Sequence, residues 1–320
     1  MSDSTMHTYG AGPRSTAATT ASARADSDVP MLPDYGGENL CHVLTSAAAS
    51  VGLSGYENTL GLPTAKRICV LLIDGLGAGA ALGHAADAPT LVGLMAGDRA
   101  ASDGAVNDGA GIGLVRGGHG DLSVVSRQLT AGFPSTTGAS LASIGTGLPP
   151  SRHGLVGYRV LIPERGTLMS LLQWDGAVDP AVWQPYPTIF EQLAQAGVST
   201  VHVASPDFAN SGLTRSAFRG ARYAGAWTPG ELIAATATAL NDDTPIVFSY
   251  YPDLDKTGHG NGVDSPAWRH QLAVVDLMVR RLIAELPTDT TLVITGDHGM
   301  VDIEPHEKLD LDSAPELTSG

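Results

Sequence analysis

The sequence predicts a three-layer α/β/α sandwich built around a mostly parallel central β-sheet. The predicted strands are continuous apolar runs, as expected for strands that helices cover on both faces. Strand and helix patterns also alternate along the chain, which is typical of parallel sheets with helical crossovers. With 320 residues, 43% of them hydrophobic and 16% charged, the chain can form one large α/β domain.

Four strands are predicted from the apolar runs. They span residues 67–73, 198–204, 245–251 and 290–295. Runs of this length are too short to cross a bilayer, so the sequence predicts no membrane span. In open α/β sheets, ligands bind beyond the carboxyl ends of the strands. The residues that follow each run are therefore the first candidates for a functional site.

Three helices are predicted from capping residues and apolar spacing. Ser265 and Pro266 begin the longest as cap and first helical residue, and Pro287 follows its end. A shorter helix over residues 188–197 leads into the second strand, and a helix of small residues ends near Thr146. The longest helix carries one buried stripe with spacings of three and four residues: Trp268, Leu272, Val275, Val279, Leu282 and Leu286.

Two segments lack such patterns. Residues 1–32 are rich in Ser, Thr, Ala and Gly without apolar periodicity, and we expect a disordered N-terminal tail. The Gly-rich stretch 104–120 predicts a surface loop or insertion. The folded domain is therefore expected within residues 33–320.

The composition excludes one class of partner and indicates a cellular compartment. The chain has 18 Lys and Arg against 33 Asp and Glu, and its net charge of −15 argues against wrapping of a nucleic acid. The N-terminus lacks the pattern of a secretory signal. The two cysteines, Cys41 and Cys69, indicate no disulfide framework, and Cys69 suits a small apolar position in the first strand. We expect a cytoplasmic protein.

Three of the predicted strands end in side chains that bind metals. Asp74 follows the first strand, Asp255 and His259 follow the third, and Asp297-His298 follow the fourth. Carboxylate oxygens and imidazole nitrogens bind divalent cations such as zinc, so this set suggests a binuclear site of the hydrolytic kind. Taken singly, an aspartate after a strand can simply cap a turn, and Asp255 and His259 can be exposed loop residues.

The turn Pro134-Ser135-Thr136-Thr137 opens the helix of small residues. A hydroxyl at this place lies beside the unpaired N–H groups and the positive end of the helix dipole, which favour a bound phosphate. A nearby metal would lower the pKa of the hydroxyl and make it a nucleophile. Serine and threonine are also ordinary N-caps, and that alternative stays open at this point.

The order of five motifs carries a resemblance to a known family. Together they resemble the alkaline phosphatase superfamily, and most closely its nucleotide pyrophosphatase/phosphodiesterase branch. The resemblance implies that residues 33–320 form an alkaline phosphatase-like hydrolase domain. The motifs are Leu72-Ile73-Asp74-Gly75, Pro134-Ser135-Thr136-Thr137, Thr146-Gly147-Leu148-Pro149-Pro150-Ser151-Arg152-His153-Gly154, Asp255-Lys256-Thr257-Gly258-His259 and Asp297-His298-Gly299.

The resemblance implies a role for each candidate residue. Asp74, Asp297 and His298 would bind one zinc together with the nucleophile, Thr137. Asp255 and His259 would bind the second zinc, and other divalent metals would also fit. The family's catalytic hydroxyl lies nine residues before the threonine that is followed by glycine, here Thr146, which selects Thr137. Thr136 remains the alternative if the helix holds an insertion.

The implied function is that of a zinc-dependent phosphodiesterase or nucleotide pyrophosphatase. Thr137 would attack a small phosphorylated substrate, a nucleotide or another phosphodiester, and water would hydrolyse the phosphothreonine intermediate. One alternative is a phosphomonoesterase or phosphomutase of the same superfamily. Another is a truncated, inactive homologue. The sequence predicts no oligomeric state.

Two departures from the family pattern bear on this function. The branch places an asparagine a few residues after His-Gly, where this chain offers Tyr158 or Arg159. Family members also carry a further metal-binding histidine near their C-terminus, whereas this chain stops at Gly320. Either His306 replaces that histidine or one zinc has fewer protein ligands. A third alternative, which we favour, is a chain short of the C-terminal end of a longer enzyme.

Overall fold

The computed structural model describes residues 32–96, 110–116 and 124–308. The predicted N-terminal tail, apart from Leu32, lies outside these ranges. From Pro33 onward, the described residues belong to one structural unit. Among its helices, none combines the length and the apolar character needed to cross a bilayer.

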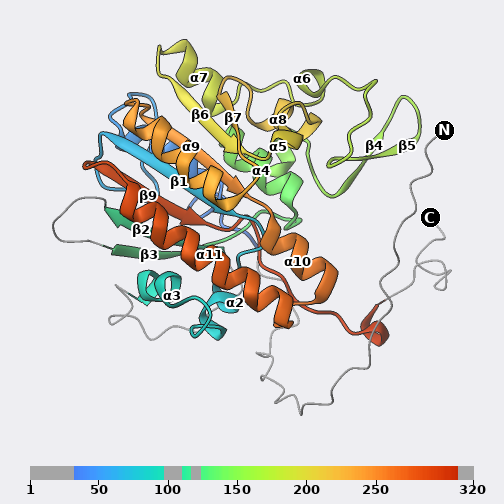
Figure 1. The fold of residues 1–320 in the computed structure, drawn as a ribbon. Helices are drawn as coiled ribbons and strands as arrows, with labels where there is room; N and C mark the ends of the chain where they lie inside the picture. Colours follow the sequence, from blue (N-terminus) through green and yellow to red (C-terminus); the bar gives the residue numbers. More distant parts are fainter. Residues whose placement is uncertain (1–31, 97–109, 117–123, 309–320) are drawn as a thin grey trace, which may run out of the picture. The chain divides into compact units, whose positions relative to one another are not determined.

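A seven-stranded sheet forms the middle layer. Its strands are Arg67–Ile73 (β1), Ala110–Arg116 (β2), Val124–Leu129 (β3), Thr200–Ala204 (β6), Arg222–Gly225 (β7), Ile246–Tyr251 (β8) and Thr290–Thr295 (β9). They lie in the order β3-β2-β9-β1-β8-β6-β7 (Figure 1). Strands β9, β1, β8, β6 and β7 run parallel, which confirms the predicted mostly parallel sheet. A separate antiparallel hairpin pairs Arg159–Ile162 (β4) with Thr167–Ser170 (β5).

The prediction of a surface loop over residues 104–120 is wrong for the central part of that stretch. Strand β2 occupies Ala110–Arg116 and pairs antiparallel with both β9 and β3. Three of its first four residues are Ala or Gly, so the run lacks the apolar density that marks the other strands. Pairing with two neighbours supplies the backbone hydrogen bonds that hold it in the sheet. Residues 104–109 and 117–120 lie outside the described residues.

Helices cover both faces of the sheet. They are His42–Ser50 (α1), Ala78–Gly83 (α2), Pro89–Ala96 (α3), Thr137–Thr146 (α4), Pro150–His153 (α5), Pro180–Trp183 (α6), Ile189–Gln195 (α7), Gly212–Ala217 (α8), Pro229–Asn241 (α9), Asp253–Asn261 (α10) and Pro266–Glu285 (α11), with 3₁₀ turns at Pro206–Phe208 (η2) and Pro305–Glu307 (η3). Figure 1 shows α9 and α11 lying across one face. Helices α1, α4 and α7 pack on the other. The three-layer fold predicted from the sequence is confirmed.

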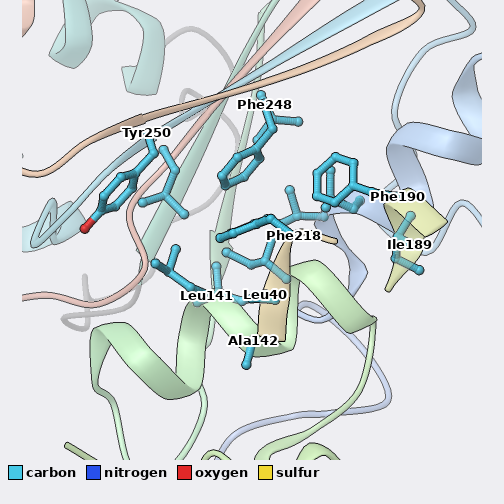
Figure 2. Close-up of a cluster of buried hydrophobic side chains, with 14 of the residues drawn as sticks. Leu40, Leu141, Ala142, Ile189, Phe190, Phe218, Phe248 and Tyr250 are labelled. Atoms are coloured by element: carbon cyan, nitrogen blue, oxygen red, sulfur yellow. The ribbon is translucent and has the colours of Figure 1, made fainter. Parts of the chain in front are cut away.

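Alternate residues of β1 enter two separate hydrophobic cores. Ile68, Val70 and Leu72 belong to the core that holds α1, α4 and α7. Cys69, Leu71 and Ile73 belong to the core beneath α9 and α11. This double burial explains why the strand is apolar without alternation. Figure 2 shows the first core, where the rings of Phe190, Phe218 and Phe248 pack together.

The three predicted helices are present with the expected caps. The Ser265 hydroxyl accepts a hydrogen bond from the Trp268 N–H at the start of α11, and Thr188 and Glu191 form a capping box at the start of α7. Helix α4 ends at Thr146, and its C-cap residue, Gly147, has the left-handed conformation (φ 70°). The predicted stripe of α11 is buried from Trp268 to Leu282, and Leu286 follows the helix as its C-cap.

Parallel pairing aligns the ends of three central strands. Ile73 of β1 lies beside Tyr251 of β8, and Leu72 lies beside Thr295 of β9. The Asp74 N–H continues the ladder by donating to the Tyr251 carbonyl (2.9 Å). The residues that follow β1, β8 and β9 therefore emerge at one edge of the sheet, where the metal-binding motifs were predicted.

Helix α4 depends on a glycine for its position. A Cβ atom at Gly145 would lie well inside contact distance of the Ala217 carbonyl oxygen on α8. We expect Gly145→Ala to lower the free energy of unfolding by about 3 kcal/mol, because neither backbone can give way cheaply. Gly93→Ala on α3 is the matched control: nothing lies within 4 Å of the added atom, and a helix-interior alanine should stabilise by up to about 1 kcal/mol. Urea unfolding of both variants measures the difference, and equal effects would contradict it.

Candidate active site

Four segments bring the predicted side chains to one point at this edge. Asp74 directly follows β1, Asp255 lies in the first turn of α10 after β8, and Asp297-His298 follow β9. Thr137 is the first residue of α4. Of the six residues predicted to bind metal, the structure gathers these five around a common centre.

The centre is the Nε2 atom of His298. The Thr137 hydroxyl oxygen lies 3.1 Å from it. Three carboxylate oxygens surround the same nitrogen, from Asp74 at 3.4 Å, Asp297 at 3.5 Å and Asp255 at 4.0 Å. The Thr137 hydroxyl also lies 3.4 Å from Asp74 Oδ1. A single small cation could contact several of these atoms at once.

The hydrogen bonds of His298 determine which ring nitrogen faces the cluster as an electron-pair donor. Its Nδ1 lies 3.0 Å from the Gly299 carbonyl oxygen, which can only accept. Nδ1 therefore carries the proton, and in the neutral ring Nε2 presents its lone pair to Thr137 and the carboxylates. A backbone carbonyl that fixes the tautomer in this way is a common feature of metal-binding histidines.

Asp297 is held firmly by one oxygen and leaves the other unpaired. It is fully buried (0% exposed), and its Oδ1 accepts hydrogen bonds from the N–H groups of Gly75 (3.1 Å) and His298 (3.0 Å). Its Oδ2 has no hydrogen-bond partner, and neither has the buried Oδ1 of Asp255. Buried carboxylate oxygens without a donor are costly. The donor set therefore fits one or more divalent cations at this centre.

Electrostatics support the same conclusion. Burial, followed by the neighbouring carboxylates of Asp297 and Asp255, raises the pKa of Asp74 well above its usual range. Burial also raises the pKa of Asp255, although His298 and His259 oppose the shift. Three carboxylates crowded into a buried pocket repel one another, and a cation among them removes that repulsion.

Tyr250 is a member of the cluster that sequence reasoning missed. Its hydroxyl donates a hydrogen bond to Asp74 Oδ2 from within β8. The interaction leaves Asp74 Oδ1 directed to Thr137 and His298. Burial, together with Asp74, raises the pKa of Tyr250 well above its usual range, so the hydroxyl keeps its proton and remains a donor. The available signal was a tyrosine hydroxyl inside an apolar strand, where a polar group needs a buried partner.

His259 lies at the edge of the cluster. It is one helical turn after Asp255 on α10, and its Nε2 is 3.5 Å from Asp255 Oδ1. Its side chain is 74% exposed, unlike those of the other five residues. Asp255 therefore lies between His298 and His259, and its Oδ1 is 4.0 Å from the Nε2 atom of the first and 3.5 Å from that of the second.

The remaining candidates lie outside this cluster. His153 is buried beside α4, where its Nε2 lies 3.0 Å from the Ser143 hydroxyl, consistent with a structural role. His306 is exposed in η3, and Arg159 is exposed on β4. Tyr158 is half exposed and lines a cavity of about 990 Å³ that Thr137, Asp255 and His298 also line. This cavity offers room for a substrate at the Thr137 hydroxyl.

The N-terminus of α4, at Thr137, is suited to binding an anion. Thr136 is the N-cap of α4, but its side chain makes no capping hydrogen bond, and its buried hydroxyl has no partner. The first backbone N–H groups of α4 are therefore not satisfied by the cap. Such groups, at the positive end of a helix dipole, bind phosphate oxygens.

The three-layer arrangement, with an acidic cluster at the strand ends, is an alkaline phosphatase-like fold. The family described as Type I phosphodiesterase / nucleotide pyrophosphatase matches residues 68–318. Because this match covers most of the chain, the protein belongs to that family, as its motifs predicted.

Individual relatives agree with the family assignment. The human ectonucleotide pyrophosphatase/phosphodiesterase family member 7 is 27% identical over 197 residues, which are 57% of this chain and 42% of the human protein. The structure of murine ectonucleotide pyrophosphatase/phosphodiesterase 5 has a TM-score of 0.54 at 20% identity, covering 77% of this chain and 61% of the murine one. An inactive variant of the murine protein has been solved in complex with AMP, with a TM-score of 0.52, 19% identity and coverage of 77% and 60%. This chain thus spans less than two thirds of the length of each relative.

Proposed function

We propose that this protein is a metal-dependent phosphodiesterase of the nucleotide pyrophosphatase type, with Thr137 as its nucleophile. The observation that carries the proposal is the hydroxyl of Thr137 at a helix N-terminus, 3.1 Å from His298 Nε2 and 3.4 Å from Asp74 Oδ1. Family membership supports the reaction class. The AMP complex of the murine relative supports a nucleotide as one substrate.

The ligand set favours two divalent cations, and its mixed oxygen and nitrogen donors suit zinc. Asp74, Asp297 and His298 would hold one ion next to Thr137, and Asp255 with His259 would hold the other. Bound cations would neutralise the carboxylates, lower the pKa of the Thr137 hydroxyl and stabilise negative charge at phosphorus.

Different residues of the chain would act in the successive steps of the reaction. The N-terminal N–H groups of α4 orient a phosphoryl oxygen beside Thr137. The Thr137 oxygen attacks phosphorus and forms a phosphothreonine ester, while the alcohol or nucleotide leaves. The Thr137 hydroxyl would lose its proton to water, because His298 Nε2, which lies 3.1 Å from it, would be engaged as a metal ligand. Water then hydrolyses the ester and restores Thr137.

Turnover of a diester and a monoester tests the proposal. We expect the zinc-loaded chain to hydrolyse bis-p-nitrophenyl phosphate at least about tenfold faster than p-nitrophenyl phosphate, in kcat/KM, because the cavity of about 990 Å³ at Thr137 can hold a second aryl group whose contacts add binding energy. A preference for the monoester would favour the phosphomonoesterase alternative. Folded, zinc-loaded protein without turnover of either substrate would favour an inactive homologue.

A further inference from the structure

The three segments that carry the acidic cluster meet at one methionine. Met300 follows His298 by two residues, and its thioether lies against one glycine from each of the other two segments. These are Gly75, which directly follows Asp74, and Gly258 in α10. A Cβ atom at Gly75 would lie 3.0 Å from Met300 Sδ, and one at Gly258 would lie 2.6 Å from Sδ and 2.7 Å from Cε. The thioether therefore fills the space that side chains at both glycines would need.

This packing fixes α10 against the end of β1. A Cβ atom at Gly75 would also lie 2.9 Å from the Cβ atom of Asp255, so Asp255 and Met300 pack on the same glycine. Gly258 is buried and directly precedes His259. Closely packed groups accept added volume only by moving. The placement of Asp255 and His259 therefore depends on the size of the group at Met300.

Met300 is the most accessible of the methionines that the structure describes. Met95, Met169 and Met278 are 8%, 3% and 1% exposed and belong to the two hydrophobic cores. Met300 is partly exposed and lines the cavity of about 990 Å³ at the active site. A small solute in that cavity can therefore reach the Met300 sulfur.

The two cysteines compete poorly for an oxidant. Cys41 is 2% exposed and Cys69 is 0% exposed. Burial raises the pKa of Cys41 to about 11 and that of Cys69 to about 12, so both remain thiols, whereas the thiolate is the reactive form. The Met300 thioether has no proton to lose, and its reactivity depends on access.

We propose that Met300 is an oxidation site at which a peroxide weakens metal binding by α10. The Met300 sulfur attacks one oxygen of hydrogen peroxide, a sulfur–oxygen bond forms and the oxygen–oxygen bond breaks. The proton of the attacked oxygen passes to the departing hydroxide, which leaves as water. The sulfur is oxidised to a sulfoxide and the peroxide is reduced. The regulatory consequence, a loss of turnover, rests on the proposed function.

A sulfoxide at Met300 disturbs α10 in either direction that its oxygen takes. An oxygen directed toward Gly75 and Gly258 finds no room and displaces α10 from the end of β1. An oxygen directed into the cavity brings negative charge to a space that Asp255 also lines, and the two repel. In both cases Asp255 and His259 lose the placement that a shared cation requires.

Peroxide treatment of the zinc-free chain, followed by zinc titration, tests this site without any turnover. We expect peptide mass mapping to find the sulfoxide at Met300 before Met95, Met169 or Met278. Calorimetry should then show at least about tenfold lower affinity for the second zinc per chain. Methionine sulfoxide reductases A and B, one for each sulfoxide epimer, should restore the affinity. This reversal uses wild type alone, so it decides the question even if a variant fails to fold.

Met300→Leu is the matched variant, because it keeps every other methionine and both cysteines. Peroxide should leave its zinc affinity within about twofold of its own untreated value. Met300→Gln places a polar amide at the same position without an oxidant, and it should bind the second zinc at least about tenfold more weakly than Met300→Leu does.

Three results would overturn the proposal. They are unaltered affinity for the second zinc when Met300 is a sulfoxide, an equal peroxide-induced loss in Met300→Leu, and oxidation of the buried methionines ahead of Met300. A different result bears on the reaction instead. If untreated protein fails to hydrolyse the diester while peroxide still weakens zinc binding through Met300, the proposed function alone is contradicted.

Discussion

Replacement of Thr137 by alanine is expected to lower kcat/KM for bis-p-nitrophenyl phosphate by at least about 1000-fold in the zinc-loaded chain. The Thr137 hydroxyl lies 3.1 Å from His298 Nε2 and 3.4 Å from Asp74 Oδ1. Among the described residues, no other side-chain hydroxyl contacts both of these atoms. Alanine retains the helix start, because Thr137 is the first residue of α4 rather than its cap. Steady-state kinetics and the zinc content of the variant are the two measurements required.

Thr136→Ala is the matched comparison, since it removes a hydroxyl from the adjacent residue. The Thr136 hydroxyl is buried and makes no capping hydrogen bond, so its loss should cost less than about tenfold in kcat/KM. A large loss in Thr136→Ala together with near-normal turnover in Thr137→Ala would assign the nucleophile to Thr136. Full zinc-dependent turnover in both variants would rule out a threonine nucleophile in this turn.

The second large effect concerns Asp297, whose replacement by asparagine should have opposite consequences with and without metal. We expect the affinity of the variant for zinc to be at least about 100-fold lower than that of wild type, because a buried anionic ligand becomes neutral. Without metal, the variant should be more stable than wild type, since one of three mutually repelling carboxylates has lost its charge. Thermal unfolding in a chelator and in excess zinc measures both consequences.

Asp276→Asn provides the control for a buried aspartate elsewhere. Asp276 lies on α11 and accepts a hydrogen bond from the Leu91 N–H (2.8 Å), well separated in sequence from the acidic cluster. Its replacement should leave zinc affinity within about twofold of wild type and should not stabilise the metal-free protein. The interpretation fails if Asp297→Asn binds zinc as tightly as wild type does.

The central sheet could be predicted because its strands are buried on both faces. The runs that became β1, β8 and β9 have no polar alternation, and the motif residues follow directly at their ends. Strand β2 could not be recognised, because glycine and alanine dominate its first residues and its pairing with β9 is a long-range contact. Strand β7 was missed because it has only four residues, none of them buried, and therefore no apolar run.

The candidate active site could be predicted as far as residue types at strand ends reveal it. Asp74, Asp255 and His298 were found because carboxylates and imidazoles there are conspicuous. Tyr250 was not, since it lies inside a strand, and its role depends on the Asp74 carboxylate that faces it in three dimensions. The exposure of His259 was likewise invisible, because a four-residue spacing does not reveal which side of α10 is covered.

The most direct test of metal-assisted phosphodiester hydrolysis is zinc content and turnover measured on the same sample. The chain is stripped with a chelator, titrated with zinc and assayed with bis-p-nitrophenyl phosphate at each step. We predict no turnover in the stripped chain and a rise in turnover that saturates as the second zinc per chain binds. Full turnover by the stripped chain, or two tightly bound zinc ions in the Asp297→Asn variant, would contradict a catalytic metal centre at this cluster.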